Sequence, residues 1–353
     1  MPEPTPATPA LPDGVDGLLG ANVTLVTGKG GVGKTTVAAA LALASAASGR
    51  RTLLVDVEGR QSLSRAFSTP EWDYSEREFR PGLHGASLDP AEAVYEYLEL
   101  FYGLRRVQWV MEKSNAIDFV TAAAPGLRDL LLVGKVYEIE ARRAADGRRR
   151  YDQIVLDAPP TGRIVPFLQA PEGVTEIVRV GPIRRQASQI REMLQDPRRT
   201  QAVLVTLLEE MPVQEAVEGV SVLHEAGLAV GPVVANATTV PRVDADTAER
   251  ITTLGTDGLV AATDGRLGGA AAALAVDWTG RHVDRVQLER EQRRDLSERS
   301  GLPMLELPLL TGPAFGPDEL HLLADLLVDQ VGGSATRVDE VPGWRAHLAG
   351  ERT

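Results

Sequence analysis

The stretch Gly28-Lys29-Gly30-Gly31-Val32-Gly33-Lys34-Thr35-Thr36 decides the fold of this 353-residue chain. It satisfies the phosphate-loop pattern G-x-x-x-x-G-K-[ST] and carries a second lysine directly after the first glycine. The chain has only four lysines, and two of them lie in this loop, whereas arginine supplies nearly all of the other positive charge. Because a compact ammonium group suits phosphate oxygens in a narrow loop, this stretch predicts a phosphate-binding site.

The flanks of the loop predict a strand before it and a helix after it. Residues 22–27 form a short apolar, β-branched run that is typical of a buried parallel strand. Residues 35–44 are rich in alanine and leucine, which favour a helix, and Gly49 is suited to end it. In such a unit the backbone N–H groups and the helix N-terminus hold phosphates. Lys34 would then reach the β- and γ-phosphates, and the Thr35 hydroxyl would bind Mg²⁺.

Runs typical of strands alternate with longer helical patterns, which predicts an α/β fold with a doubly wound, mainly parallel sheet. The expected strands are 22–27, 52–57, 83–88, 116–122, 152–157, 202–207, 229–235 and 303–307. The expected domain runs from 21 to 331, with helical additions at about 91–145 and 174–197 that form a subdomain. The proline-rich residues 1–20 predict a disordered lead-in and residues 332–353 a tail, while residues 243–300 have no pattern that places them.

The composition argues against several classes of protein. A net charge of −12 argues against nucleic acid as the main partner. The absence of cysteine excludes disulfides, thiolate metal sites and cysteine nucleophiles, and the five histidines are too scattered for a zinc site. The chain shows neither a bilayer-spanning stretch nor a signal peptide, so we expect a cytoplasmic protein that is not integral to a membrane.

Carboxylates follow two of the expected strands, at the edge where ligands of such sheets bind. Asp157 ends the strand 152–157 and is expected to hold Mg²⁺, directly or through water. Glu58 follows the strand 52–57 and is favoured as the group that orients or deprotonates the attacking water. Asp56 is its rival, because it can point toward the magnesium site, and one of the two could instead be a structural or capping residue.

Asn236 ends the strand 229–235. Its amide could pair with the edge of an adenine ring, because it offers both a donor and an acceptor. Asparagine is also common in turns after strands, so this residue alone is a weak indication.

These motifs resemble those of the ArsA-type ATPases, a family of P-loop NTPases with a deviant Walker A loop (the SIMIBI class). The family includes the arsenite-pump ATPase and the tail-anchored-protein targeting ATPase. The glycine loop matches fully. The family's second switch reads like Asp-Thr-Ala-Pro-Thr-Gly-His. Here residues 157–163 read Asp-Ala-Pro-Pro-Thr-Gly-Arg, followed by Phe-Leu-Gln at 167–169 and a proline at 171. The resemblance runs from about residue 22 to residue 330.

The resemblance implies a dimeric ATPase that uses ATP, ADP and Mg²⁺. Lys29 would reach across the interface to the partner's nucleotide, ATP would close the dimer, and hydrolysis would open it. Because the chain has one phosphate loop, the partner is expected to be a second copy or a paralogue, and the dimer would handle a protein client or a membrane partner. The implied nucleotide contacts are Gly28, Gly30, Gly31, Val32, Gly33, Lys34, Thr35, Thr36, Asn236 and Pro308, the last within an adenine loop that runs from Leu307 to Phe315.

The chain departs from the family's pattern in its first switch and its cysteines. The family carries Asp-Pro-Ala-His where residues 58–61 read Glu-Gly-Arg-Gln, so the catalytic aspartate becomes Glu58 and slow turnover is expected. The cysteines that bind arsenite or zinc in relatives are absent, which excludes thiolate binding of arsenite. A set of large side chains within 91–145 is equally consistent with a client groove and with a helical core: Tyr97, Leu98, Phe101, Trp109 and Met111.

Two other functions stay open from the sequence. A spatial organiser of the MinD or ParA type would need a basic amphipathic helix or a basic face, whereas residues 316–331 are acidic. A nucleotide-dependent subunit that hardly hydrolyses ATP, paired with a hydrolysing paralogue, would follow if Glu58 is a poor catalyst.

Overall fold

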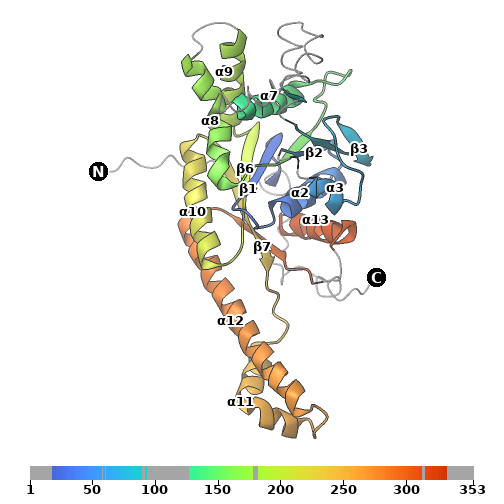
Figure 1. Cartoon of the computed structure of the whole chain (residues 1–353), viewed down its shortest axis with the longest axis vertical. Coiled ribbons are helices and arrows are strands. Elements are labelled where there is room, and N and C mark those ends of the chain that lie inside the picture. Colours follow the sequence, from blue (N-terminus) through green and yellow to red (C-terminus); the bar gives the residue numbers. More distant parts are fainter. Residues whose placement is uncertain are drawn as a thin grey trace, which may run out of the picture.

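The computed structural model describes residues 18–57, 59, 61–89, 92–93, 127–177, 182–311 and 315–331. Its centre is an eight-stranded sheet in the order β3-β4-β2-β5-β1-β6-β7-β8 (Figure 1). Neighbouring strands pair in parallel except β3 and β4, which are antiparallel. The predicted α/β fold with a mainly parallel sheet is therefore confirmed. The strands are β1 (Val23–Gly28), β2 (Thr52–Asp56), β3 (Arg77–Arg80), β4 (Leu83–Ser87), β5 (Gln153–Asp157), β6 (Thr200–Thr206), β7 (Ala229–Thr238) and β8 (Met304–Pro308).

Helices cover both faces of the sheet, because successive strand residues point to opposite faces and both sets are apolar. In β5, Ile154 and Leu156 pack with α7, α8, α9 and α10, whereas Val155 packs with α2, α3 and α13. The helices are α2 (Lys34–Ala47), α3 (Ser62–Ala66), α7 (Leu127–Ala141), α8 (Thr161–Ile177), α9 (Pro182–Gln195), α10 (Glu210–Glu225), α11 (Ala245–Ala262), α12 (Gly269–Ser300) and α13 (Pro317–Val331).

The structure adds one strand that the sequence does not predict and leaves one predicted strand undescribed. Strand β3 reads Arg-Glu-Phe-Arg and is the outermost of the described strands, where polar residues are tolerated because only one side pairs with another described strand. The strand expected at 116–122 lies outside the described residues.

The expected helical additions are only partly described. Helix α7 lies in the first of them, while residues 94–126, with the five large side chains considered for a client groove, lie outside the described residues. The second contains α9, but the helix before it, α8, already begins at Thr161. The terminal segments 1–17 and 332–353 also lie outside, so the domain boundaries stay predictions. Among the described helices, none is both long and apolar enough to cross a bilayer.

Residues 245–300 form a helical arm that extends from the sheet at the end where β7 points (Figure 1). Helix α12 has 32 residues and α11 packs along its outer part, with a kink at Gly255. At 1.5 Å per residue, α12 is about 48 Å long. The arm carries most of the exposed large apolar side chains found among the described residues, namely Leu254, Leu274, Trp278, Val283 and Leu288.

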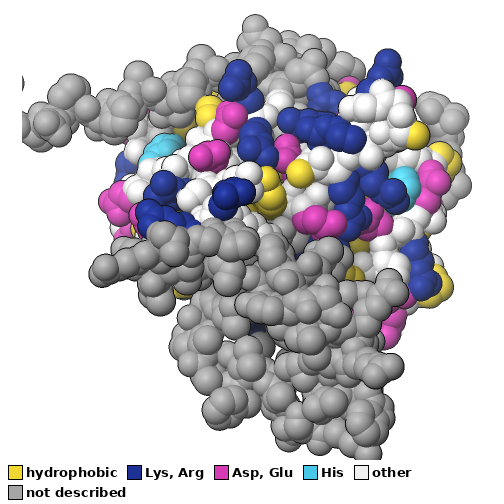
Figure 2. Space-filling view, turned by 90° about the horizontal axis from the view of Figure 1, so that it is seen from above, with side chains coloured by type: hydrophobic (Ala, Val, Ile, Leu, Met, Phe, Trp, Pro, Cys, Tyr) yellow, Lys and Arg dark blue, Asp and Glu magenta, His cyan; other side chains and the backbone are white. Residues whose placement is uncertain are grey.

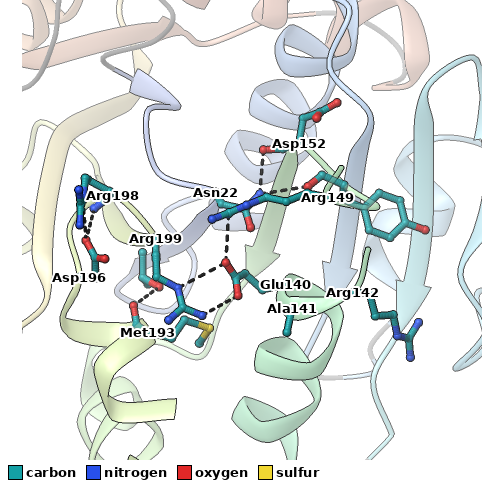
Figure 3. A network of polar contacts seen from close by, with 12 residues as sticks. Asn22, Glu140, Ala141, Arg142, Arg149, Asp152, Met193, Asp196, Arg198 and Arg199 are labelled. Carbon is teal, nitrogen blue, oxygen red and sulfur yellow. Dashed lines mark hydrogen bonds and ion pairs between the residues drawn. The ribbon is translucent and has the colours of Figure 1, made fainter. Parts of the chain in front are cut away.

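The opposite end of the molecule, with α7 and α9, is rich in arginine. Figure 2 views this end and shows the basic side chains interspersed with acidic ones. The buried carboxylate of Glu140 accepts from Arg149 at 3.0 Å and from Arg199 at 2.6 Å (Figure 3). These ion pairs connect α7 to the segments that lead into β5 and β6. Arg149 and Arg199 therefore stabilise the fold at this end of the molecule.

Candidate functional site

The glycine loop begins where β1 ends, at the carboxyl edge of the sheet, and leads directly into α2. Gly28 has a φ of 153°, and a Cβ atom there would lie 2.2 Å from the carbonyl oxygen of Val205 in β6. Gly33 has a φ of 90°, and a Cβ atom there would lie 2.1 Å from Nδ2 of Asn236. Both positions exclude a side chain, so the spacing of these two glycines has a steric cause in this fold.

The other residues of the loop are held less tightly. Gly31 has a φ of 87°, which favours glycine, whereas Gly30 has no positive φ and no neighbour within 4 Å of a Cβ position. Val32 is buried, and its carbonyl oxygen accepts a hydrogen bond of 2.9 Å from Nδ2 of Asn236. Thr36 lies half-buried in the first turn of α2.

The two loop lysines contact different groups of the protein. Lys34 is the first residue of α2, and its Nζ donates to the carbonyl oxygen of Lys29 at 3.2 Å. The Nζ of Lys29 lies 2.5 Å from Oε1 of Glu215 in α10. Glu215 could not be expected from the sequence, because no local pattern connects residues so far apart in the chain.

Thr35 and Asp157, which the sequence names as magnesium ligands, lie next to each other. The hydroxyl of Thr35 donates to Oδ2 of Asp157 at 2.6 Å. Strand β5 pairs with β1 in a register that sets Asp157 beside Val26, so the carboxylate reaches the start of α2. The segment after Asp157 is fixed to β1 as well, because the Thr27 hydroxyl donates to the Pro159 carbonyl oxygen at 2.7 Å.

Asp56 anchors the segment that follows β2. Its buried carboxylate accepts from the backbone N–H of Gly59 at 2.9 Å and from that of Gln61 at 3.1 Å. The Gln61 side chain in turn bonds both backbone groups of Trp72, at 2.8 and 2.9 Å. Glu58, the predicted water-orienting residue, lies outside the described residues. Asp56 therefore has a structural role, which is one of the alternatives that the sequence leaves open.

The predicted base-binding residues come from neighbouring strands at the same edge of the sheet. Asn236 lies in β7 and Pro308 ends β8, and the two strands pair at Thr238 and Pro308. The backbone N–H of Leu309 donates to the Thr238 carbonyl oxygen at 2.9 Å. Leu309 and Phe315 are exposed, so the chain offers apolar surface just after β8.

An open cavity of about 240 Å³ lies beside the glycine loop and is lined by Gly31, Gly33, Lys34, Thr35, Asp56, Ser62 and Asp157. The lining combines a cation, two hydroxyls and two carboxylates, which is suited to phosphate groups with a metal ion. Ser62, the first residue of α3, is the one lining residue that the sequence analysis did not name. In the sequence, the only indication that Ser62 belongs to the site is its place a few residues after Asp56 and Glu58.

The donor set of the cavity fits magnesium. Mg²⁺ prefers hard oxygen ligands and usually takes one or two carboxylates, with phosphate and water completing its shell. The Thr35 hydroxyl and the Asp157 carboxylate already lie within 2.6 Å of each other, and Asp56 lines the same cavity. These residues could therefore hold the ion with few rearrangements.

Comparison with known protein families gives a match over residues 21–189 to ArsA_ATPase, described as an anion-transporting ATPase. The match spans the glycine loop, Asp56 and Asp157, which meet in the cavity. Over residues 21–189 the chain belongs to the ArsA-type ATPase family. The family resemblance recognised in the sequence is thereby confirmed for these residues.

Several curated relatives support this ArsA-type assignment. The chain is 42% identical to ATPase BagA of Mycobacterium tuberculosis over 224 residues, which cover 62% of this chain and 66% of that protein. It is 29% identical to an arsenical pump-driving ATPase of Acidiphilium multivorum over 225 residues, 57% of this chain and 37% of that protein. An Escherichia coli protein of the same name is 28% identical over 216 residues, 54% of this chain and 34% of that protein. The matches thus span less than two thirds of these relatives' lengths.

The ArsA-type match ends before the arm, which is nonetheless tied to the site. Three residues after Asn236, Thr239 donates from its backbone N–H and its hydroxyl to the Glu289 carboxylate, each at 2.7 Å. Arg285 bonds Glu289 at 2.8 Å and also Glu209, just before α10, at 3.1 Å. Glu289 is 2% exposed, so this buried carboxylate joins the arm to the end of β7, while Arg285 joins the arm to the segment between β6 and α10.

We expect His282 of α12 to make the stability of the arm depend on pH. Its Nε2 accepts a hydrogen bond from the backbone N–H of Arg242 at 3.1 Å, which requires the neutral ring, and its ring stacks on Trp278. Burial lowers the pKa of His282 below its usual 6.5, and Arg242 adds to the effect. The unfolded chain therefore binds a proton more readily, so the stabilisation is complete above about pH 6.5 and is lost as the pH falls through the lowered pKa.

We expect the free energy of unfolding of the wild-type chain to exceed that of a His282→Gln variant by more at pH 7.5 than at pH 5.5. Urea titrations of both proteins at the two pH values measure this difference. An equal difference at both values would show that His282 is not held neutral by its surroundings.

Proposed function

We propose that this ArsA-type chain binds ATP with Mg²⁺ at residues 28–36 and hydrolyses it to ADP and phosphate. The observation that supports this best is the hydrogen bond between Thr35 and Asp157, which joins the glycine loop to the neighbouring strand inside a cavity that also contains Lys34. The family match and the names of the relatives agree with ATP as the nucleotide. In this proposal the protein acts in the cytoplasm, where Mg-ATP is supplied.

The groups that would hold the phosphates come from the start of α2. The backbone N–H groups of the glycine loop and the N-terminus of α2 would face the phosphate oxygens, and Lys34 would give up its 3.2 Å contact with the Lys29 carbonyl to bind them. Thr35 and Asp157 would hold Mg²⁺, Asp157 directly or through water. When bound, the ion neutralises charge on the β- and γ-phosphate oxygens.

The base would lie at the ends of β7 and β8. Asn236 uses one N–H of its amide on the Val32 carbonyl oxygen, which leaves its second N–H and its carbonyl oxygen for the edge of an adenine. Pro308 and the apolar residues that follow it would cover a face of the ring. The bond to Val32 also fixes the amide close to the glycine loop.

The attacking water needs a base or an orienting group, and we assign that role to Glu58. Asp56 is less suited, because both of its carboxylate oxygens accept from the backbone N–H groups of Gly59 and Gln61. The water oxygen would attack the γ-phosphorus, and the bond to the β–γ bridging oxygen would break. Glutamate in place of the family's aspartate is expected to make this step slow.

The same proposal includes a partner subunit. Lys29 would contact the nucleotide of a second copy of this chain or of a paralogue, so that ATP closes a dimer and hydrolysis opens it. The dimer would act on a protein client or a membrane partner. This part rests on the family's mechanism and on the exposed position of Lys29, whose side chain is 55% exposed.

If the proposal holds, the rate of phosphate release per chain should rise with protein concentration and then level off once most of the subunits are dimeric. A Lys29→Ala variant should lose this dependence and most of the activity, because the contact across the interface is gone. An Arg198→Ala variant, changed at an exposed arginine of the opposite end, serves as the control and should behave like the wild type. A wild-type rate per chain that is constant over a 100-fold range of protein concentration would argue against the dimer.

A further inference from the structure

The contact between Lys29 and Glu215 joins the site to a helix that the ArsA-type match does not cover. Lys29 follows β1, and Glu215 lies in the second turn of α10, which follows β6. Strands β1 and β6 are neighbours in the sheet, so both side chains start from the same edge. Their Nζ and Oε1 atoms are 2.5 Å apart, with the side chains 55% and 25% exposed.

Neighbouring carboxylates of α10 contact other residues. Glu218, one turn further along, accepts from Gln214, and Glu209 is bonded to Arg285 of the arm. Glu215 is thus the carboxylate of this helix that the structure sets against the glycine loop. Replacing it removes one ion pair while the other polar contacts of the helix stay in place.

A nucleotide phosphate and the Glu215 carboxylate would compete for the same ammonium group. Both are anionic oxygen acceptors, and a lysine is a single compact charge on a flexible stem. Lys29 cannot keep its 2.5 Å contact with Oε1 and also extend to a phosphate of a facing subunit. Its carbonyl oxygen, which accepts from Lys34, belongs to the backbone and can stay in place while the side chain moves.

We propose that Glu215 is a positioning residue that holds Lys29 on its own subunit while the site is empty and releases it only to a phosphate. The inference rests on the proposed function, in which Lys29 acts on nucleotide. Glu215 would thereby limit association of empty subunits and make the closed dimer depend on ATP. The Glu215 side chain would thus take part in the control of dimer closure, although it contacts neither substrate nor metal.

The size of the effect follows from the exposure of the pair. Exposed ion pairs are weak and are screened by salt. Removing the pair should therefore lower the ATP concentration that gives half-maximal phosphate release by about two- to five-fold. The change should shrink as the salt concentration rises.

The pairing can be observed directly, because the chain has only four lysines. In protein labelled with ¹³C and ¹⁵N at lysine, the side-chain signals of Lys29 can be assigned by comparison with a Lys29→Ala variant. Without nucleotide, a Glu215→Gln variant should shift the Lys29 signals, whereas Glu218→Gln, the matched control on the same helix, should leave them in place. Addition of Mg-ATP to the wild type should move the Lys29 signals away from their paired position.

Phosphate release then tests the consequence. Glu215→Gln should lower the half-maximal ATP concentration as stated, Glu218→Gln should not, and in a Lys29→Ala background the Glu215 change should have no effect. Lys29 signals that do not respond to Glu215→Gln, or an effect of Glu215→Gln that persists without Lys29, would overturn the proposal. Failure of the wild-type chain to bind Mg-ATP or release phosphate would instead contradict the proposed function, whatever the lysine signals show about the pair.

Discussion

Replacing Lys34 with alanine should lower the rate of ATP hydrolysis by about 100- to 1000-fold, the usual cost of removing a fixed group that stabilises developing charge. Lys34 lines the cavity next to Thr35 and Asp157, and it is the first residue of α2. Among the described residues, no other lysine or arginine lines that cavity. Steady-state phosphate release with saturating Mg-ATP measures the effect.

Two further variants separate the loss of charge at Lys34 from a loss of fold. Lys34→Arg should also be strongly impaired, because a planar guanidinium does not fit where a compact ammonium does. Arg198→Ala, at a side chain that is 90% exposed, should keep the wild-type rate. A Lys34→Ala protein with more than a tenth of the wild-type rate would mean that the phosphates lie elsewhere.

Replacing Gly28 with alanine should disrupt both the loop and the protein's stability. The new methyl group would lie 2.2 Å from the Val205 carbonyl oxygen, which is part of β6 and cannot move without breaking strand pairing. Overpacking of this kind costs about 1–3 kcal/mol, and the backbone conformation, at φ 153°, adds strain. We expect the free energy of unfolding to fall by about 2–5 kcal/mol and ATP binding to be lost.

Gly30→Ala is the matched comparison for stability, since no atom lies within 4 Å of its Cβ position. Urea unfolding should give this variant a stability within about 1 kcal/mol of the wild type, the range in which glycine-to-alanine changes fall where the backbone permits them. Equal losses in the Gly28 and Gly30 variants would show that the contact with β6 is not the cause.

The loop and the central strands could be predicted from sequence because their chemistry is local. The strand before the loop is apolar and buried on both sides, and Gly28 and Gly33 belong to a pattern that can be recognised locally, although the contacts that require them, with Val205 and Asn236, are long-range. The hydrogen bond between Thr35 and Asp157 follows from the order of the strands, since β5 lies beside β1. A parallel α/β sheet with a phosphate loop therefore leaves little freedom for these two side chains.

The arm could not be predicted, because α12 has almost no apolar stripe. Its buried positions are Ala272, Thr279, Glu289 and Leu296, and two of these four are polar. The oxygens of the buried Glu289 accept from Arg285, four residues earlier on the same helix, and from Thr239, which lies 50 positions away and cannot be recognised from local sequence. Strand β3 could not be predicted for a related reason, since its sequence Arg-Glu-Phe-Arg does not alternate between apolar and polar residues as a half-buried strand does.

The contacts that hold Asn236 and Lys29 in place at the site are likewise long-range. Asn236 bonds Val32 across 204 positions of the chain, and Glu215 meets Lys29 across 186. Asn236 could be named from its place at the end of a strand, as a weak indication that the family resemblance then supported, whereas nothing in the sequence indicated Glu215. The pairing of such residues becomes visible only in the folded structure.

Calorimetric titration of the purified chain with ATP, with and without Mg²⁺, followed by measurement of phosphate release in the same samples, tests the central claim most directly. Saturable ATP binding that strengthens with Mg²⁺, slow release of phosphate, and loss of both in an Asp157→Ala variant are the results expected here. An unaltered wild-type chain that neither binds ATP at millimolar concentration nor releases phosphate would contradict the assignment of the cavity beside Thr35 and Asp157 as an ATPase site.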